Sequence, residues 1–242
     1  MSDIVYFDKY DAAGAYHWAE CDRRYANWKR YNPALDARYE LTRRAVGELG
    51  LRGCLVDVGC GDGVLMGRLA SIFDRVIGVE ADARAVGLAR EMLMPWPNCT
   101  VLHVETAGLP LEDASADVIT SADVIEHLTD PAQHLRDIGR VLKPGGALVL
   151  TTPQWRADGR WDSRHEREYR SEELRALLLE HFREVELRYY WPAIWSRFYA
   201  TRPGWRLLKL MAIQLYNPFL RISATGRQRY GQLLAVCRHA VR

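Results

Sequence analysis

The chain has 242 residues and a formal net charge of +2, with 48% hydrophobic and 26% charged residues. This length fits one sizeable α/β domain with additions and excludes two full domains. The five cysteines are scattered and lack a Cys-x-x-Cys spacing, so we predict neither a disulfide framework nor a zinc site. The acidic N-terminus has no basic and then apolar leader, and we therefore expect a cytoplasmic protein.

Aromatic residues are concentrated at the start of the chain, in residues 6–31. Asn32-Pro33 interrupts this segment, and a helix with apolar positions leads from there towards the first strand. One interpretation is that the segment packs on the core, and the other is a lid that closes over a ligand. We predict an N-terminal helical cap in residues 1–48 and a main domain in residues 49–242.

The sequence LVDVGCGDG, which begins at Leu55, is an apolar run that ends in three closely spaced glycines. It predicts a short buried strand and then a turn at Gly59, Gly61 and Gly63, where a ligand can approach the backbone. A dinucleotide fingerprint would need glycine directly after Gly63, where valine stands. The carboxylate of Asp57 would repel a pyrophosphate, but it suits a ligand that carries an ammonium and a sulfonium. The pattern therefore favours S-adenosylmethionine as the cofactor.

Two further strands are expected to contribute to the same site, because ligands of open parallel sheets bind at the carboxyl ends of the strands. Residues 75–80 form the second strand, which ends at Glu80, a carboxylate for ribose hydroxyls. Residues 101–104 form the third strand, and it ends at Glu105 and Thr106, where an adenine edge would lie.

The alternation of strands and helices continues after this point. Residues 117–121 read as a fourth strand, and Asp130 is a predicted N-cap for a helix over 131–142. Residues 147–151 read as a fifth strand. The order of elements predicts a mostly parallel sheet with helices on both faces.

Four motifs, in this order, resemble those of the class I S-adenosylmethionine-dependent methyltransferases: DVGCGDG at 57–63, GVE at 78–80, EHL at 126–128 and VLKPGG at 141–146. The pattern is similar in style to the ubiquinone-biosynthesis O-methyltransferases and covers roughly residues 50–190. The resemblance implies a Rossmann-like α/β fold with a seven-stranded, mostly parallel sheet and an antiparallel last strand.

The resemblance also implies which residues lie beside S-adenosylmethionine. Asp57 and Gly59 would face the methionine end and Glu80 the ribose, and the full expected set is Asp57, Gly59, Gly61, Glu80, Glu105, Thr106, Ser121 and Asp123. The adenine position departs from the family pattern, which has aspartate after glycine where this chain has Val104-Glu105.

Two histidines are candidates for the base that methyl transfer to a hydroxyl requires. His127 follows the fourth strand, and His165 lies in the loop after the fifth strand. Each has an alternative structural role, His127 at the start of the next helix and His165 in holding its own loop. Some relatives place a divalent metal with an acid–histidine group at this edge, which makes Glu126, His127 and His165 a candidate ligand set. We expect no metal here, because the neighbouring pair Glu126-His127 lacks the separated ligands that an ion needs.

The C-terminal part of the chain is predicted to hold an antiparallel strand pair, at residues 185–190 and 232–238, with a helical insertion at 191–226. From Leu187 to Arg242 there are ten Arg or Lys and no acidic residue. Apolar residues interleaved with cations suit an interfacial helix pair better than a membrane span. Three uses stay open for the insertion: a second lid, contact with an anionic membrane, or the interface of a homodimer. Nucleic acid is disfavoured by the high apolar content.

The functional hypothesis is methylation of a small-molecule or sugar-containing acceptor at oxygen, and the basic C-terminus suits an acceptor that bears phosphate or lipid. Methylation of an amine is the alternative. A protein that binds the cofactor without catalysis is an alternative of another class. RNA methylation is disfavoured, because the Asn/Asp-Pro-Pro-Tyr type of signature is absent after the fourth strand, at residues 122–125.

Overall fold

The computed structural model describes residues 9–105, 108–157, 162–195, 198, 200–225 and 230–241. The strands are β1 Cys54–Val58, β2 Arg75–Glu80, β3 Cys99–His103, β4 Ala116–Ala122, β5 Leu142–Pro153, β6 Phe182–Pro192 and β7 Tyr230–Ala240. The α-helices are α1 Lys9–Ala13, α2 Tyr16–Glu20, α3 Pro33–Glu48, α4 Val64–Leu69, α5 Ala83–Met92, α6 Pro131–Val141, α7 Ser171–Leu179 and α9 Arg202–Gln214. Short 3-10 turns are η1 Tyr25–Asn27, η2 Ile125–His127, η3 Ala193–Trp195 and η4 Pro218–Leu220.

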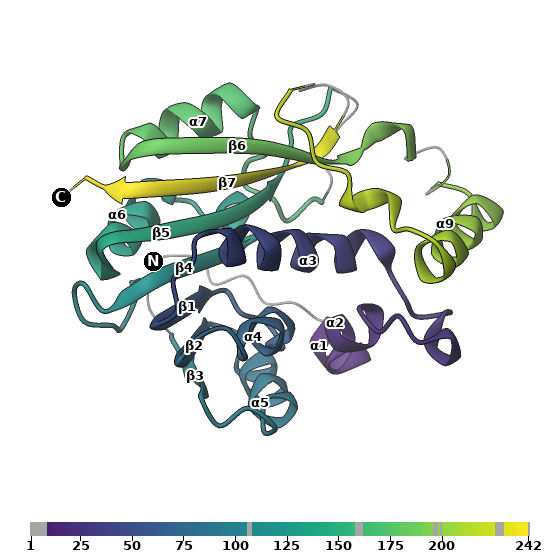
Figure 1. Ribbon diagram of the computed structural model, residues 1–242, viewed down its shortest axis with the longest axis horizontal. Helices are drawn as coiled ribbons and strands as arrows, with labels where there is room; N and C mark the ends of the chain where they lie inside the picture. The colour runs from purple at the N-terminus through teal and green to yellow at the C-terminus, as the bar shows by residue number, and fades with distance from the viewer. Residues whose placement is uncertain are drawn as a thin grey trace.

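All seven strands form one sheet in the order β3-β2-β1-β4-β5-β7-β6 (Figure 1). The first five strands run parallel, and β7 pairs antiparallel with both β5 and β6. The reversal of strand order at β1 and β4 creates the switch point at which α/β sheets bind ligands. The predicted fold class is confirmed, including the antiparallel last strand.

Alternation along each strand sends side chains into two hydrophobic layers, one on each face of the sheet. Leu55 of β1 packs with α3, α4 and α5, whereas its neighbour Val56 packs with α6 and α7. Ile119 of β4 is buried in the second layer and Val118 in the first. The sheet is therefore covered by helices on both faces, as the buried parallel strands require.

The fifth strand begins five residues earlier than the sequence indicates. Helix α6 ends at Val141, and Leu142 already pairs with Ala116 of β4. The Lys143 ammonium binds the Asp117 carboxylate at 2.8 Å, and Gly145 takes a positive φ of 81°. The Pro-Gly-Gly stretch after the helix is thus held as an irregular strand end instead of a loop.

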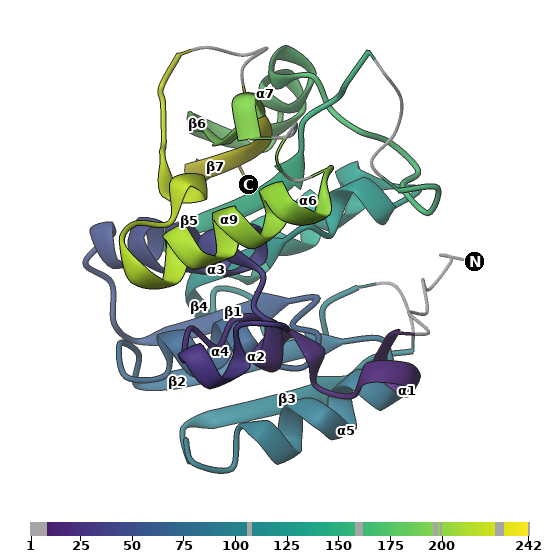
Figure 2. The same ribbon diagram turned by 90° about the vertical axis from the view of Figure 1, so that its right-hand side faces the viewer.

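The N-terminal segment divides into two parts that pack differently. Helices α1 and α2 lie beside α4 and α5, whereas α3 runs along the sheet (Figures 1 and 2). Leu41 and Val46 of α3 are fully buried in the same layer as β1. Within the predicted cap, α3 therefore belongs to the main core.

The predicted insertion lies between β6 and β7, as expected, and contains η3, α9 and η4. Leu208 of α9 and Phe219 of η4 are buried against Ala34 and Ala37 of α3. Over the described residues, no helix has both the length and the apolar character needed to cross a membrane.

Candidate active site

The turn after β1 depends on glycine at three positions. Gly59, Gly61 and Gly63 have φ values of 71°, 54° and 81°, a left-handed region that side chains disfavour. A Cβ on Gly59 would lie 2.5 Å from a methyl carbon of Val124, in the segment after β4. The two loops that follow β1 and β4 are therefore in direct contact at the switch point.

Asp57 is buried near the carboxyl end of β1. Its Oδ1 accepts a hydrogen bond from the Thr120 hydroxyl of β4 at 2.7 Å. Burial raises the pKa of the Asp57 carboxyl from 3.8 to about 7. Because burial disfavours the ionised form of this carboxyl, a cationic ligand such as the ammonium of S-adenosylmethionine would stabilise that form.

Glu80 ends β2 and organises the neighbouring turn. Its carboxylate accepts hydrogen bonds from the backbone N–H groups of Gly61, Ala81 and Asp82, at 2.8, 2.8 and 2.9 Å. The Glu80 carboxylate can accept about four hydrogen bonds, and these three leave one position for a hydroxyl of a ligand. Burial raises the pKa of Glu80 above its usual 4.5, an effect that these three hydrogen bonds oppose. These features fit a ribose ligand.

The start of the chain covers the glycine turn. His17 binds the buried Asp62 carboxylate through its backbone N–H and its Nδ1, both at 3.0 Å. The Trp18 indole N–H donates to the Asp62 carbonyl at 2.7 Å. The Tyr10 hydroxyl lies 2.5 Å from the position that a Cβ on Gly61 would take. Helices α1 and α2 are therefore placed as a cover over the predicted cofactor loop.

The remaining predicted cofactor residues occupy different positions. Glu105 is exposed just beyond β3, and Thr106 lies outside the described residues. Ser121 is fully buried, with its Oγ 3.5 Å from the His134 Nε2 of α6. Because the Ser121 side chain points towards α6, any contact between Ser121 and a cofactor would come from the Ser121 backbone.

Asp123 is held in a strained conformation at the end of β4. Its φ is +55°, and its carboxylate pairs with Arg38 of α3 and accepts from the Thr151 hydroxyl at 2.8 Å. The Asp123 charge raises the pKa of Arg38, against the opposing effect of burial. Sequence reasoning missed Arg38, which reaches the sheet edge from a helix more than eighty residues away.

Glu126, His127 and His165 form a cluster at the same edge, with one potential ligand atom of each within 4.8 Å of the others. The Glu126 Oε2 accepts from the Thr152 hydroxyl at 2.9 Å. The Glu126 Oε1 is buried without a hydrogen-bond partner in the described part of the chain. The structure thus brings together the three residues that the sequence analysis named as a candidate ligand set.

Both histidines of the cluster are oriented by groups that accept a hydrogen bond. The His127 Nδ1 lies 3.2 Å from the Arg164 carbonyl, and the His165 Nδ1 lies 2.9 Å from the Glu168 Oε1. These acceptors place the proton of each neutral ring on Nδ1 and the lone pair on Nε2. Burial lowers the pKa of His127 below 6.5, and it raises the pKa of Glu126 well above 4.5.

This arrangement permits two kinds of chemistry. A neutral His127 can accept a proton near pH 7, and the three side chains offer a carboxylate and two imidazoles to a divalent ion. The structure brings together Glu126, His127 and His165, the three residues considered as a ligand set, and the expectation of no metal stays a prediction.

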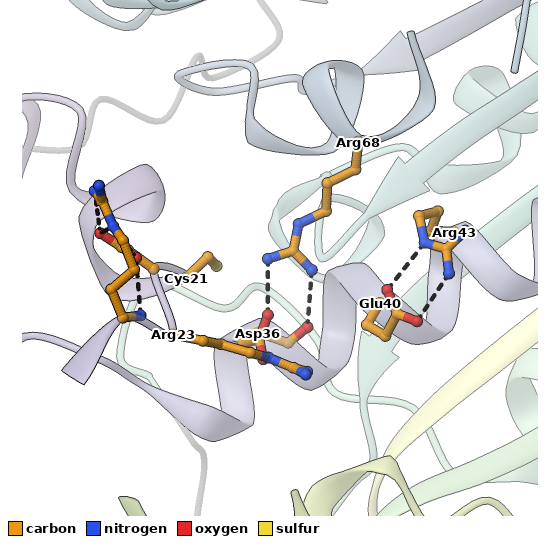
Figure 3. Close-up of a pocket in the computed structure, with 8 residues that line it drawn as sticks. Cys21, Arg23, Asp36, Glu40, Arg43 and Arg68 are labelled. Carbon is orange, nitrogen blue, oxygen red and sulfur yellow. Dashed lines mark hydrogen bonds and ion pairs between the residues drawn. The ribbon is translucent and has the colours of Figure 1, made fainter. Parts of the chain in front are cut away.

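A separate cavity of about 440 Å³ lies between the segment after α2 and helices α3 and α4 (Figure 3). Arg68 and Arg23 both bind the Asp36 carboxylate, at 2.7 and 2.6 Å, and Arg43 binds Glu40 at 2.9 Å. No residue of the glycine turn lines this cavity. Its paired charges fasten the N-terminal segment to the core and lie apart from the candidate site.

Comparison with known proteins assigns the central part of the chain. Residues 56–150 match the family described as "Methyltransferase domain". The chain carries a class I S-adenosylmethionine-dependent methyltransferase domain. The matched segment contains the glycine turn, Glu80 and the Glu126-His127 pair, and S-adenosylmethionine is the cofactor of this domain.

Curated relatives resemble this methyltransferase domain but not the whole chain. A probable S-adenosylmethionine-dependent methyltransferase of Mycolicibacterium smegmatis is 39% identical over 99 residues, which are 41% of this chain and 37% of that protein. A ubiquinone biosynthesis O-methyltransferase of Cereibacter sphaeroides is 35% identical over 115 residues, 43% of this chain and 41% of that protein. The chain thus spans less than half the length of these relatives.

Solved structures share the fold over more of the chain. The [4+2]-cyclase SpnF has a TM-score of 0.61 and 23% identity, covering 84% of this chain and 82% of that one. At this identity the likeness shows the fold alone, and a cyclase on the same fold shows that the reaction must be argued from the site.

Proposed function

We propose that the protein transfers a methyl group from S-adenosylmethionine to a hydroxyl oxygen of a small-molecule or sugar-containing acceptor. The observation that carries this proposal is the cluster of Glu126, His127 and His165 beside the predicted cofactor loop. Val124, two residues before Glu126, packs directly against Gly59. This contact supports a proton acceptor close to the position at which the methyl group would be presented.

The bound cofactor supplies a methyl group on a sulfonium, which is a good leaving group. The chain has to orient the acceptor and receive its proton, and orientation alone contributes on the order of 7–11 kcal/mol to such a step. We assign the proton acceptor to His127, whose lowered pKa keeps the ring neutral near pH 7. His165, oriented by Glu168, is the second candidate. The need for a base favours oxygen over an amine, which reacts in its neutral form.

A second use of the cluster is supported by the Glu126 Oε1, which is buried without a hydrogen-bond partner among the described residues. A divalent ion held by Glu126, His127 and His165 would lower the pKa of an acceptor hydroxyl directly. Titration of the apo protein with Zn²⁺ or Mn²⁺ separates the two accounts. Binding of one ion, lost in His165→Ala, together with activity that chelation removes, supports the ion. Activity that survives chelation supports His127 as the base.

The proposal is tested by the release of S-adenosylhomocysteine when acceptors are presented. Pools of sugars, sugar phosphates and phenols are expected to support release, and pools of primary amines are not. The double variant His127→Ala/His165→Ala should lose the acceptor-dependent release, and His239→Ala, in the exposed part of β7, should keep it. Release with amines alone would favour N-methylation. No release with any pool, despite cofactor binding, would favour a non-catalytic binding protein.

A further inference from the structure

Exposed apolar side chains are concentrated on the insertion between β6 and β7. Of the eleven large apolar residues that are exposed in the described part of the chain, seven lie between residues 191 and 226. They are Ile194, Phe198, Leu207, Leu210, Leu215, Tyr216 and Ile222. Such a concentration on one segment marks an interaction surface.

Helix α9 is fixed to the core by one face and presents the other face to solvent. Leu208 is buried against Ala34 and Ala37 of α3, Ala212 is also buried, and the Lys209 ammonium donates to the Lys29 carbonyl at 2.6 Å. Leu207 is 56% exposed and Leu210 is 39% exposed. Figure 2 shows α9 lying across the outside of the molecule, in front of α3. The exposed leucines therefore belong to a helix whose opposite face is held against the core.

The surface around these leucines is basic. Arg202 and Arg206 are exposed on α9, and Arg221 is exposed after η4. The Lys209 hydrogen bond places the loop of Lys29 and Arg30, both exposed, next to the same helix. Two basic segments that are far apart in the sequence thus lie side by side, and from Leu187 to the last residue the chain contains no carboxylate side chain.

We infer that the exposed face of α9, with the Lys29–Arg30 loop, contacts the surface of an anionic lipid bilayer. Leucine and tyrosine side chains can enter the interface while the arginines meet lipid phosphates, and these two contributions together give stable peripheral attachment. A second copy of the chain fits less well. A two-fold contact through this face would bring the arginine side chains of the two copies towards each other.

This attachment would also orient the edge of the sheet that carries the candidate site relative to the bilayer. Ala37, one of the two alanines against which α9 packs, directly precedes Arg38, the partner of Asp123 in the candidate site. The inference about the bilayer does not depend on the identity of the acceptor. If the proposed O-methylation is correct, the position favours an acceptor carried on a lipid.

Vesicle co-sedimentation of the whole chain tests the inference. Binding to phosphatidylglycerol vesicles is expected to exceed binding to phosphatidylcholine vesicles by about tenfold and to fall steeply between 50 and 500 mM NaCl. The variants Leu207→Gln/Leu210→Gln and Arg202→Gln/Arg206→Gln should each lower the partition coefficient by about tenfold. Both pairs are exposed, so the thermal melting temperature should stay unchanged.

The matched control is Met94→Gln/Arg52→Gln, which removes one exposed apolar and one exposed basic residue elsewhere on the surface. It should bind vesicles like the natural sequence. Equal binding to both lipids without salt dependence, or no binding to either, overturns the inference. Self-association in the absence of lipid that the α9 variants abolish would overturn it in favour of a second copy. Release of S-adenosylhomocysteine during methylation of a water-soluble acceptor is measured in parallel. A loss of activity and a loss of vesicle binding are therefore distinguished.

Discussion

His17 binds the buried Asp62 carboxylate through two nitrogen atoms, each at 3.0 Å, and so joins α2 to the glycine turn. Since Asp62 lies between Gly61 and Gly63, this contact couples the cap to the loop that is expected to hold the cofactor.

Replacement of His17 by alanine should weaken S-adenosylmethionine binding about five- to tenfold. The change removes a side-chain hydrogen bond to a buried carboxylate, worth about 1–1.5 kcal/mol, and leaves that oxygen without its partner. Calorimetric titration measures the effect. His239→Ala, which removes an exposed histidine beside Glu184, serves as the control and should leave the affinity unchanged. An unaltered affinity in folded His17→Ala would show that the cap does not act on the loop.

Asp57 predicts a specific dependence of stability on pH. Its pKa is about 7 in the folded protein, against 3.8 for the ordinary carboxyl. Between these values the folded state holds one proton more than the unfolded state. The Asp57 contribution to the free energy of unfolding therefore falls by roughly 4 kcal/mol from pH 4 to pH 7 and is constant above that.

Asp57→Asn should remove this contribution, so that the variant loses less stability than the natural protein as the pH rises towards 7. Urea denaturation of both proteins at pH 5, 6, 7 and 8 measures the difference. Asp74→Asn, at an exposed position, should follow the natural protein. Parallel curves for Asp57→Asn and the natural protein would mean that Asp57 is ionised throughout.

His127→Ala is expected to lower the turnover number by roughly 10²–10⁴ while leaving the cofactor affinity intact. Because burial lowers the pKa of His127 below 6.5, the natural enzyme should keep more than half of its maximal rate at pH 6.5 and lose the rest as the pH falls further. Glu168→Gln should have a smaller effect, since Glu168 acts by orienting His165. A rate that is unchanged in both His127→Ala and His165→Ala would exclude this cluster as the proton acceptor.

Much of the fold could be predicted because its signals are local. The apolar run and glycines after Leu55 and the carboxylate at Glu80 identified a loop and a neighbouring strand end without any tertiary information. The early start of β5 could not be predicted, since Pro-Gly-Gly normally ends a helix in a loop. Here the Lys143–Asp117 ion pair and the pairing of Leu142 with Ala116 hold it at the sheet.

The candidate site was predictable only in part, for the same reason. His127 and His165 were identified as candidates, but their contact depends on the path of the loop after β5, which the sequence does not show. Arg38 gives no sequence signal, because its role arises only when α3 packs along the sheet and reaches Asp123. Residues next to a sequence motif were therefore found. A residue such as Arg38, whose partner is distant in the sequence, was missed.

Arg38→Ala should destabilise the protein by about 3–5 kcal/mol, because it leaves the Asp123 carboxylate with a largely buried charge and no cationic partner. Arg44→Ala on the same helix also removes an ion pair, with Glu40, but that arginine is 50% exposed and its loss should cost about 0.3–0.5 kcal/mol. Denaturation of the two variants side by side gives both values. Similar losses would mean that the Arg38 pair is no stronger than a surface pair.

The central claim is that S-adenosylmethionine lies between the glycine turn and Glu80, with its methyl group directed towards His127. A crystal structure of the whole chain with S-adenosylhomocysteine tests this most directly. We predict that the ribose hydroxyls bind the Glu80 carboxylate, and that Asp57→Ala and Glu80→Ala each lose about 1.5–3 kcal/mol of binding free energy by calorimetry. A ligand bound away from Gly59, Gly61 and Glu80, or unchanged affinity in both folded variants, would contradict the account.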